Sequence, residues 1–247
     1  MSKERNRHPL STIWQVDYGD SDVLMIYDWH AGPYPSRVRI AVAELGLTSH
    51  INFTSVDLWT GEHKRPDFLA KNYSGTLPVL QIEDGTYLGE CTAITQYLDA
   101  LGDTPRLTGT TPRDQGMIHM MTKRAEIEFL DAISVYFHHA TAGLGPDVEL
   151  YQNAEWGLRM RDKALRGARY FDGVLKDQPY VAGNAFSMAD ITVIAGFVFA
   201  KIVGLQIPTE LVSIHAWHAR MLERPSVQHW KEMHLPSEAT NSSRPAV

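Results

Sequence analysis

Two short segments near the start of the chain mix apolar and polar residues as strands do, and a segment with helical spacing separates them. Residues 24–29 and 51–56 are rich in β-branched and aromatic side chains, which is typical of strands. Between them, apolar residues recur at helical spacing from Val38 to Leu45, and Gly46 follows as a helix stop. This order predicts a strand, a crossover helix and a second, parallel strand.

A second group of elements follows a polar stretch. Residues 78–82 and 86–88 flank Asp84-Gly85, a dipeptide that favours a tight hairpin turn. Apolar residues at i, i+3, i+4 and i+7 then predict an amphipathic helix over 94–101. The complete order is βαβ followed by ββα, and we expect this α/β domain to occupy residues 23–102.

The remainder of the chain has a helical pattern. Residues 103–112 are rich in turn formers, so we interpret them as a linker between two domains. Beyond the linker we expect an all-α domain over 113–235. Its helices are predicted over 114–138, 148–176, the apolar run 191–205, and 210–223, which stops before Pro225.

Three shorter segments complete the predicted organisation. Ser187-Met-Ala-Asp190 resembles a capping box at the start of the apolar helix. Residues 1–22 lack the continuous apolar stretch of a secretory signal, so we interpret them as an N-terminal extension. We expect residues 236–247 to be a flexible tail.

Composition and charge exclude several classes of function. A net charge of −6 disfavours a nucleic-acid partner, because phosphate neutralisation needs clustered Lys and Arg. The single cysteine, Cys91, excludes an internal disulfide framework and indicates a reducing compartment such as the cytoplasm. The run 191–205 is too short to span a bilayer and contains Lys201, so no membrane partner is expected. His138-His139 has no matching carboxylate or cysteine cluster, so we expect no metal.

Residues of three kinds in the first half point to recognition of a peptide. Leu77-Pro78 opens a strand after a turn, and a cis bond there would let the Leu77 main chain pair with an extended ligand. An ordinary trans proline at a sheet edge is the alternative. Glu90-Cys91 stands where a strand passes into a helix, a position that suits an α-amino acid group. The alternative is that Glu90 only complements the helix dipole and Cys91 is a small buried residue.

The third kind is a cationic pair, His63-Lys64, in the polar connection before Pro66. It could clamp a carboxylate, or it could be part of a solvated loop.

Taken together, these motifs resemble the cytosolic glutathione transferases over residues 24 to 230. The motifs that carry the resemblance are Gly61-Glu-His-Lys64, Pro66-Asp-Phe-Leu69, Gly75-Thr-Leu-Pro-Val79, Gly89-Glu-Cys-Thr-Ala-Ile94 and Ser187-Met-Ala-Asp-Ile191. The resemblance implies a thioredoxin-like N-terminal domain, an all-helical C-terminal domain, a homodimer, and glutathione as co-substrate.

The resemblance also implies glutathione-binding roles for particular residues. Leu77 and Pro78 would bind the cysteinyl main chain, and Glu90 and Cys91 would hold the γ-glutamyl end. The family usually has Ser after the acidic residue, so Cys91 weakens that side-chain hydrogen bond and leaves the amide in place. Lys64 and His63 would meet the glycine carboxylate. Ser187 and Asp190 would be structural.

The group that activates the thiol is not evident, because the usual Ser or Cys at the entry to the first helix is replaced by Gly32. Glutathione reacts as a thiolate, so hydrogen bonding or positive potential must lower its pKa. Tyr34, Ser36, or main-chain amides reinforced by the helix dipole are the candidates, with His30 a distant fourth. Turn packing or capping is the structural alternative for each side chain.

We therefore expect a glutathione S-transferase that binds glutathione as thiolate and adds it to small hydrophobic electrophiles. The electrophile pocket is expected between the domains, with Phe129, Tyr136, Phe137 and His138 as candidates, although aromatics at helical spacing also occur in cores. Glutathione-dependent reduction of disulfides or peroxides is the alternative activity. A glutathione-binding module without catalysis is the alternative from another class.

Overall fold

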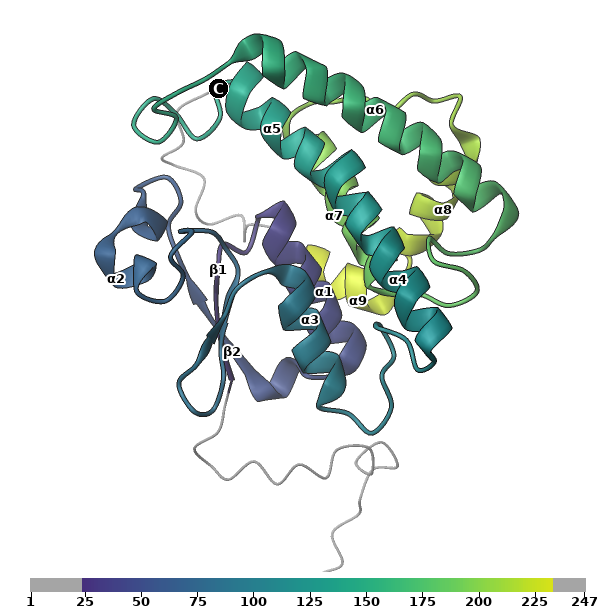
Figure 1. Ribbon diagram of the computed structural model, residues 1–247, viewed down its shortest axis with the longest axis horizontal. Coiled ribbons are helices and arrows are strands. Elements are labelled where there is room, and N and C mark those ends of the chain that lie inside the picture. Colours follow the sequence, from purple (N-terminus) through teal and green to yellow (C-terminus); the bar gives the residue numbers. More distant parts are fainter. Residues whose placement is uncertain (1–23, 233–247) are drawn as a thin grey trace, which may run out of the picture.

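The computed structural model describes residues 24–232, in which a small α/β domain packs against a bundle of helices (Figure 1). The predicted extension and tail lie outside the described residues, and so does the outer end of each predicted domain. The strands and helices of the first domain are β1 (Leu24–Asp28), α1 (Pro33–Leu45), β2 (Ile51–Ser55), α2 (Pro66–Leu69), β3 (Val79–Gln81), β4 (Tyr87–Leu88) and α3 (Cys91–Ala100), with short 3₁₀ turns at Thr48–His50 and Glu62–Lys64.

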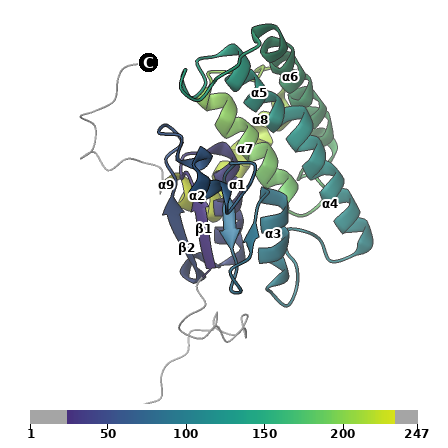
Figure 2. The same cartoon turned by 60° about the vertical axis from the view of Figure 1, so that its left-hand side comes forward.

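The sheet of the first domain has the strand order β2-β1-β3-β4. β1 and β2 are parallel, as the crossover pattern predicted, and β3 and β4 form the predicted antiparallel hairpin. α1 and α3 cover one face of the sheet, and α2 covers the other (Figure 2). Phe68 of α2 packs there with Val56 and Val79 in a separate small core. This is the thioredoxin-like arrangement expected from the sequence.

The second domain is helical throughout, as expected. Its elements are α4 (Pro112–Ala125), a π-helical segment (Glu126–Leu130), α5 (Asp131–Ala140), α6 (Ala154–Asp177), α7 (Met188–Ile202), α8 (Val212–Leu222) and α9 (Pro225–Glu232). α7 lies at the centre, where ten consecutive residues from Met188 to Phe197 are buried. The capping box is confirmed, because Ser187 and Asp190 satisfy each other's main-chain amides. Within residues 24–232, no helix is long and apolar enough to cross a membrane.

Three details of the helical domain differ from the prediction. The helix predicted over 114–138 contains one π turn, which divides it into α4 and α5. α6 begins at Ala154 instead of near 148, because the Asn153 side chain accepts a hydrogen bond from the Trp156 amide and caps the helix there. Residues 225–232 form α9, since Pro225 both follows α8 and occupies the first position of a new helix.

The π turn is accompanied by two close contacts with neighbouring helices. An ideal Cβ on Gly167 of α6 would lie 2.2 Å from the Glu128 carbonyl oxygen, and one on Gly196 of α7 would lie 2.3 Å from the Phe129 ring. Only glycine permits either approach. Glu126 at the start of this segment and Asp131 directly after it both contact the first domain, as described below.

Candidate functional site

The main chain before β3 presents unpaired polar groups. The Leu77-Pro78 peptide bond is cis. Within residues 24–232, neither the amide nor the carbonyl of Leu77 has a hydrogen-bond partner. Leu77 is half-buried and belongs to the small core on the α2 side of the sheet. A main-chain donor and acceptor next to one another are suited to pairing with an extended peptide.

Glu90 stands at the start of α3 in a conformation that few residues adopt. Its φ of 63° and ψ of 119° make it the only non-glycine residue with positive φ in the described part of the chain. Such a backbone costs about 1–3 kcal/mol and is found preferentially at ligand sites. The Glu90 side chain is exposed and has no hydrogen bond or ion pair with the described residues. Its carboxylate and the first amides of α3 are therefore available to a ligand with both charges.

Cys91, the next residue, has a structural contact. Its Sγ donates to the Tyr34 carbonyl oxygen at 3.3 Å, which ties the start of α3 to α1. Burial raises the pKa of the Cys91 thiol to about 11, although the nearby Arg37 guanidinium opposes that shift. Cys91 is therefore a neutral thiol at physiological pH.

The cationic pair lies in the 3₁₀ turn that precedes α2. Lys64 Nζ donates to the Gly75 carbonyl at 2.8 Å and to the Ser74 carbonyl at 3.3 Å. These bonds place its ammonium beside the turn that leads into Leu77. His63 is 4% exposed, and its Nδ1 has no partner among the described residues. Burial, Lys64 and His138 together lower the pKa of His63, which favours a neutral imidazole able to donate or accept one hydrogen bond.

The entry to α1 carries the candidates for thiol activation. Ser36 is fully buried, and its Oγ donates to the Pro33 carbonyl at 2.6 Å. Pro33 and Pro35 have no amide, and the Ser36 amide donates to the Gly32 carbonyl. The Tyr34 amide is thus the one N–H of residues 33–36 without an acceptor in the described part of the chain.

The Tyr34 side chain reaches across to the helical domain. Its hydroxyl donates to Asp131 Oδ1 of α5 at 2.7 Å. Burial, followed by the Asp131 carboxylate, raises the pKa of Tyr34 well above 10, so the phenol stays protonated. The hydroxyl is consequently occupied as a bridge between domains. His30, the remaining candidate, is exposed beside Trp29.

The predicted electrophile-pocket residues separate into two groups. Phe129 is fully buried and packs edge-on against Phe197, so it belongs to the core of the helical domain and does not line an accessible pocket. Tyr136, Phe137 and His138 are half-buried on α5. Phe137 contacts Phe199 of α7 at 5.5 Å between ring centroids, and Tyr34 meets the same ring at 6.5 Å. Phe199 thus joins α1, α5 and α7 in one aromatic cluster that the sequence did not reveal.

His138 also organises the connection that follows α5. Its Nδ1 lies 2.7 Å from Glu149 Oε1, which accepts the Leu144 amide as well. Among residues 24–232, no three His, Cys, Asp or Glu side chains are grouped as they would be to hold a metal ion.

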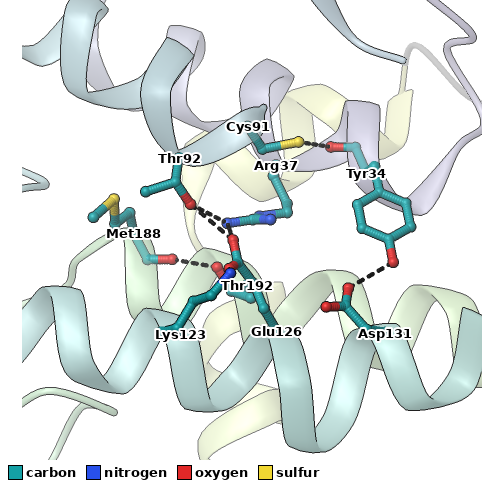
Figure 3. Close-up of polar contacts among 9 residues, drawn as sticks. All are labelled: Tyr34, Arg37, Cys91, Thr92, Lys123, Glu126, Asp131, Met188 and Thr192. Carbon is teal, nitrogen blue, oxygen red and sulfur yellow. Dashed lines mark hydrogen bonds and ion pairs between the residues drawn. The ribbon is translucent and has the colours of Figure 1, made fainter. Parts of the chain in front are cut away.

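An ionic cluster around the buried Arg37, beside the first turn of α3, was not evident from the sequence (Figure 3). Arg37 of α1 donates to Glu126 Oε1 at 2.8 Å and to Thr92 Oγ1 at 3.1 Å. Thr92 Oγ1 donates to the same Glu126 oxygen at 2.8 Å, and Lys123 Nζ lies 2.9 Å from Glu126 Oε2. Burial alone would raise the pKa of Glu126, but Arg37, Lys123 and Thr92 outweigh it and hold the pKa below its ordinary value.

The fold defines a class of protein: a thioredoxin-like domain with unpaired main-chain groups before β3, packed against an all-α domain. Comparisons with known proteins agree with this class. The model of the glutathione S-transferase N-terminal domain matches residues 31–101, and that of the C-terminal domain matches residues 128–225. Glutathione S-transferase 2 of Saccharomyces cerevisiae is 64% identical over 214 residues, which are 87% of this chain and 92% of that protein.

Solved structures of glutathione S-transferases are also similar to this chain. The crystal structure of Gtt2 from Saccharomyces cerevisiae has 65% identity and a TM-score of 0.83, covering 83% of this chain and 99% of the other. A glutathione S-transferase domain-containing protein from Marinobacter aquaeolei has 46% identity and a TM-score of 0.81, covering 82% and 99%. The chain belongs to the glutathione S-transferase family and is an enzyme of that family.

Proposed function

We propose that the protein binds glutathione as its thiolate and adds it to small hydrophobic electrophiles. The observation that carries the proposal is the pairing of an open main-chain edge at Leu77 with a free carboxylate at Glu90. The tripeptide would align its cysteinyl main chain with Leu77 beside Pro78. Its γ-glutamyl ammonium would meet Glu90, while its γ-glutamyl carboxylate would meet the amides of Cys91 and its successors.

The other end of the tripeptide fits the cationic turn. Lys64 is held beside the turn that leads into Leu77, and a glycine carboxylate would draw its ammonium away from the main-chain carbonyls. His63 Nδ1, which is buried and has no partner within residues 24–232, would supply one further hydrogen bond. Together, the Leu77 main chain, the Glu90 end of α3, Lys64 and His63 would form a binding site for a short peptide with a charged group at each end.

For activation of the thiol, we propose the main-chain account. The hydroxyls of Tyr34 and Ser36 donate to Asp131 and Pro33, which favours the Tyr34 amide, at the positive end of α1 and without an acceptor among the described residues. The electrophile would lie against the aromatic cluster of Tyr34, Phe137 and Phe199, with Tyr136 and His138 nearby on α5.

Two experiments test the proposal. Calorimetry should show saturable binding of glutathione, and conjugation of chlorodinitrobenzene should exceed reduction of hydroxyethyl disulfide. Faster disulfide reduction would favour the reductase alternative, and tight binding without turnover of a broad electrophile panel would favour a binding module. Gly32 has no side chain that could form a mixed disulfide at the usual position.

The activating group is tested separately. Tyr34→Phe and Ser36→Ala should leave the pKa of bound glutathione, followed by thiolate absorbance in the ultraviolet, close to that in the unchanged protein. A rise of about one unit or more in either variant, equivalent to roughly 1.4 kcal/mol, would assign the role to that hydroxyl.

A homodimer in the cytoplasm, with a role in detoxification, completes the proposal. Met117 and Met120 are exposed on α4, and Tyr170 of α6 lies over the same helix through contacts with Arg124 and Met121. An exposed apolar surface of this kind suits a subunit interface. Sedimentation velocity should give twice the chain mass, and a monomer at all concentrations would contradict this part of the proposal.

A further inference from the structure

Contacts from two sides hold the first turn of α3. The role assigned to them below rests on the proposed function. On one side Cys91 Sγ contacts the Tyr34 carbonyl of α1. On the other, Thr92 Oγ1 lies between Arg37 of α1 and Glu126 of the helical domain (Figure 3). Three elements that are distant in the sequence therefore meet immediately behind Glu90.

The cluster is buried more deeply than an ordinary surface ion pair. The side chain of Arg37 is 5% exposed and that of Glu126 is 13% exposed, whereas Lys123 at the edge is 60% exposed. Buried charged pairs contribute little net stability compared with apolar residues, so their presence invites another explanation. The best-attested explanation is that such groups fix the geometry of their surroundings, and here they hold the Thr92 hydroxyl in place.

Glu90 supplies the independent observation. A non-glycine residue at φ 63° and ψ 119° relaxes unless its surroundings over-determine it. Its own side chain gives no such support, because it has no partner among the described residues. The residues that follow it in the turn, Cys91 and Thr92, make contacts that supply such a restraint.

We propose that Thr92, Glu126 and Arg37 are positioning residues for glutathione. Their part-buried contacts fix the first turn of α3, so that Glu90 keeps its strained backbone and directs its carboxylate to the γ-glutamyl end of the ligand. The helical domain thus contributes to recognition of the γ-glutamyl group without touching the ligand. Loss of the cluster would weaken only the ligand contacts that this turn makes.

The test compares two ligands that differ in the γ-glutamyl group alone. S-hexylglutathione and S-hexyl-cysteinylglycine are titrated by calorimetry into the full chain and into Thr92→Val and Glu126→Gln. Each variant should bind S-hexylglutathione about tenfold more weakly, the effect of losing one charge-assisted hydrogen bond. Binding of S-hexyl-cysteinylglycine should stay within about twofold of the unchanged protein.

The control is Glu155→Gln, which makes the same chemical change in an exposed ion pair with Arg159 on α6. It should leave both affinities unchanged. If Glu126→Gln does not fold, Thr92→Val, which removes only a hydroxyl, decides the matter.

The outcomes separate this inference from the proposed function. If both ligands bind equally more weakly to the variants, the cluster has only a general structural role. If both variants keep the affinities of the unchanged protein, the cluster has no role in ligand binding. Failure of the unchanged protein to bind S-hexylglutathione would instead overturn the proposed function, and the inference with it.

Discussion

Replacing Gly32 by serine introduces a side chain that the family usually carries at the entry to the first helix. The structure predicts that this substitution will lower stability and will not raise activity. An ideal Cβ on Gly32 would lie 2.8 Å from Pro35 Cδ, 3.0 Å from Pro35 Cγ and 3.1 Å from the Trp29 carbonyl oxygen. The proline ring has little freedom to move, and the carbonyl accepts the Gly32 amide. The backbone itself must therefore shift.

The magnitude follows from two opposing effects. Overpacking of this kind costs about 1–3 kcal/mol. Gly32 has an ordinary φ of −73°, which serine can adopt. Serine would also restrict the unfolded chain, and this effect stabilises the folded state by about 0.4–1 kcal/mol. The expected net loss of about 1–2 kcal/mol corresponds to a fall in Tm of roughly 2–8 °C for a chain of this size.

The assay combines thermal unfolding with kcat/KM for chlorodinitrobenzene. Gly32→Ser should melt earlier and gain no activity, since its hydroxyl would enter on a displaced helix entry. Gly173→Ser is the matched control, because a Cβ on Gly173 of α6 meets nothing within 4 Å and serine is the better helix former. A Gly32→Ser protein as stable as the unchanged chain, with a higher kcat/KM, would refute the packing argument and the main-chain account together.

Three further predictions concern buried groups. Asp190→Asn should lose about 3 kcal/mol in urea unfolding, because Asp190 accepts from the Val181 and Ser187 amides, Ser187 Oγ and Trp217 Nε1; a loss below about 1 kcal/mol would contradict it. Cys91 should not react with Ellman's reagent in the native protein at mildly alkaline pH, yet give one equivalent in guanidinium, since it is buried with its pKa raised to about 11 and is the only cysteine. Because the folded-state pKa of Glu126 lies below its ordinary 4.5, its contribution to stability is present above pH 4.5 and is lost as pH falls further. The urea midpoint of Glu126→Gln should therefore fall less between neutral pH and acid than that of the unchanged chain, and parallel curves would argue against the assignment.

Elements whose signals are local could be predicted from the sequence. The Asp84-Gly85 turn, the Gly46 helix stop and the capping box of α7 each depend on a few neighbouring residues. The predicted start of α6 was wrong because Val148 and Leu150 continue the helical spacing, whereas the cap at Asn153 determines where the helix begins. α9 was missed because a proline that ends one helix also suits the first turn of the next.

The π turn left no periodic signal that a reader of the sequence could use. Apolar residues at Ala125, Phe129 and Ile133 keep an acceptable helical spacing whether or not one extra residue is inserted. The trace of the turn lies elsewhere, in Gly167 and Gly196, which make room for it from two other helices. Such a signal becomes readable only when the packing partners are known.

The predicted site shows the same division between local and distant information. Leu77, Pro78, Glu90 and Lys64 stand in short motifs, so the sequence alone could propose them as ligand-binding residues. The partners that determine their surroundings are far away in sequence: Tyr34 and Asp131 are 97 positions apart, and Arg37 and Glu126 are 89 apart. No spacing rule links residues at such separations, so the engagement of the Tyr34 hydroxyl was not foreseeable.

Two buried arginines on α1 show how the domains depend on one another. Arg39 pairs in a bidentate manner with Asp28 of the same domain, so its charge is satisfied locally. Arg37, two residues earlier, finds its carboxylate on Glu126 of the helical domain. An N-terminal domain without that partner would carry an uncompensated charge beneath Thr92, at the turn on which Glu90 depends. In the proposed function the helical domain therefore supports the turn that holds Glu90 as well as lining the proposed electrophile pocket, and the two domains are expected to act as one binding unit.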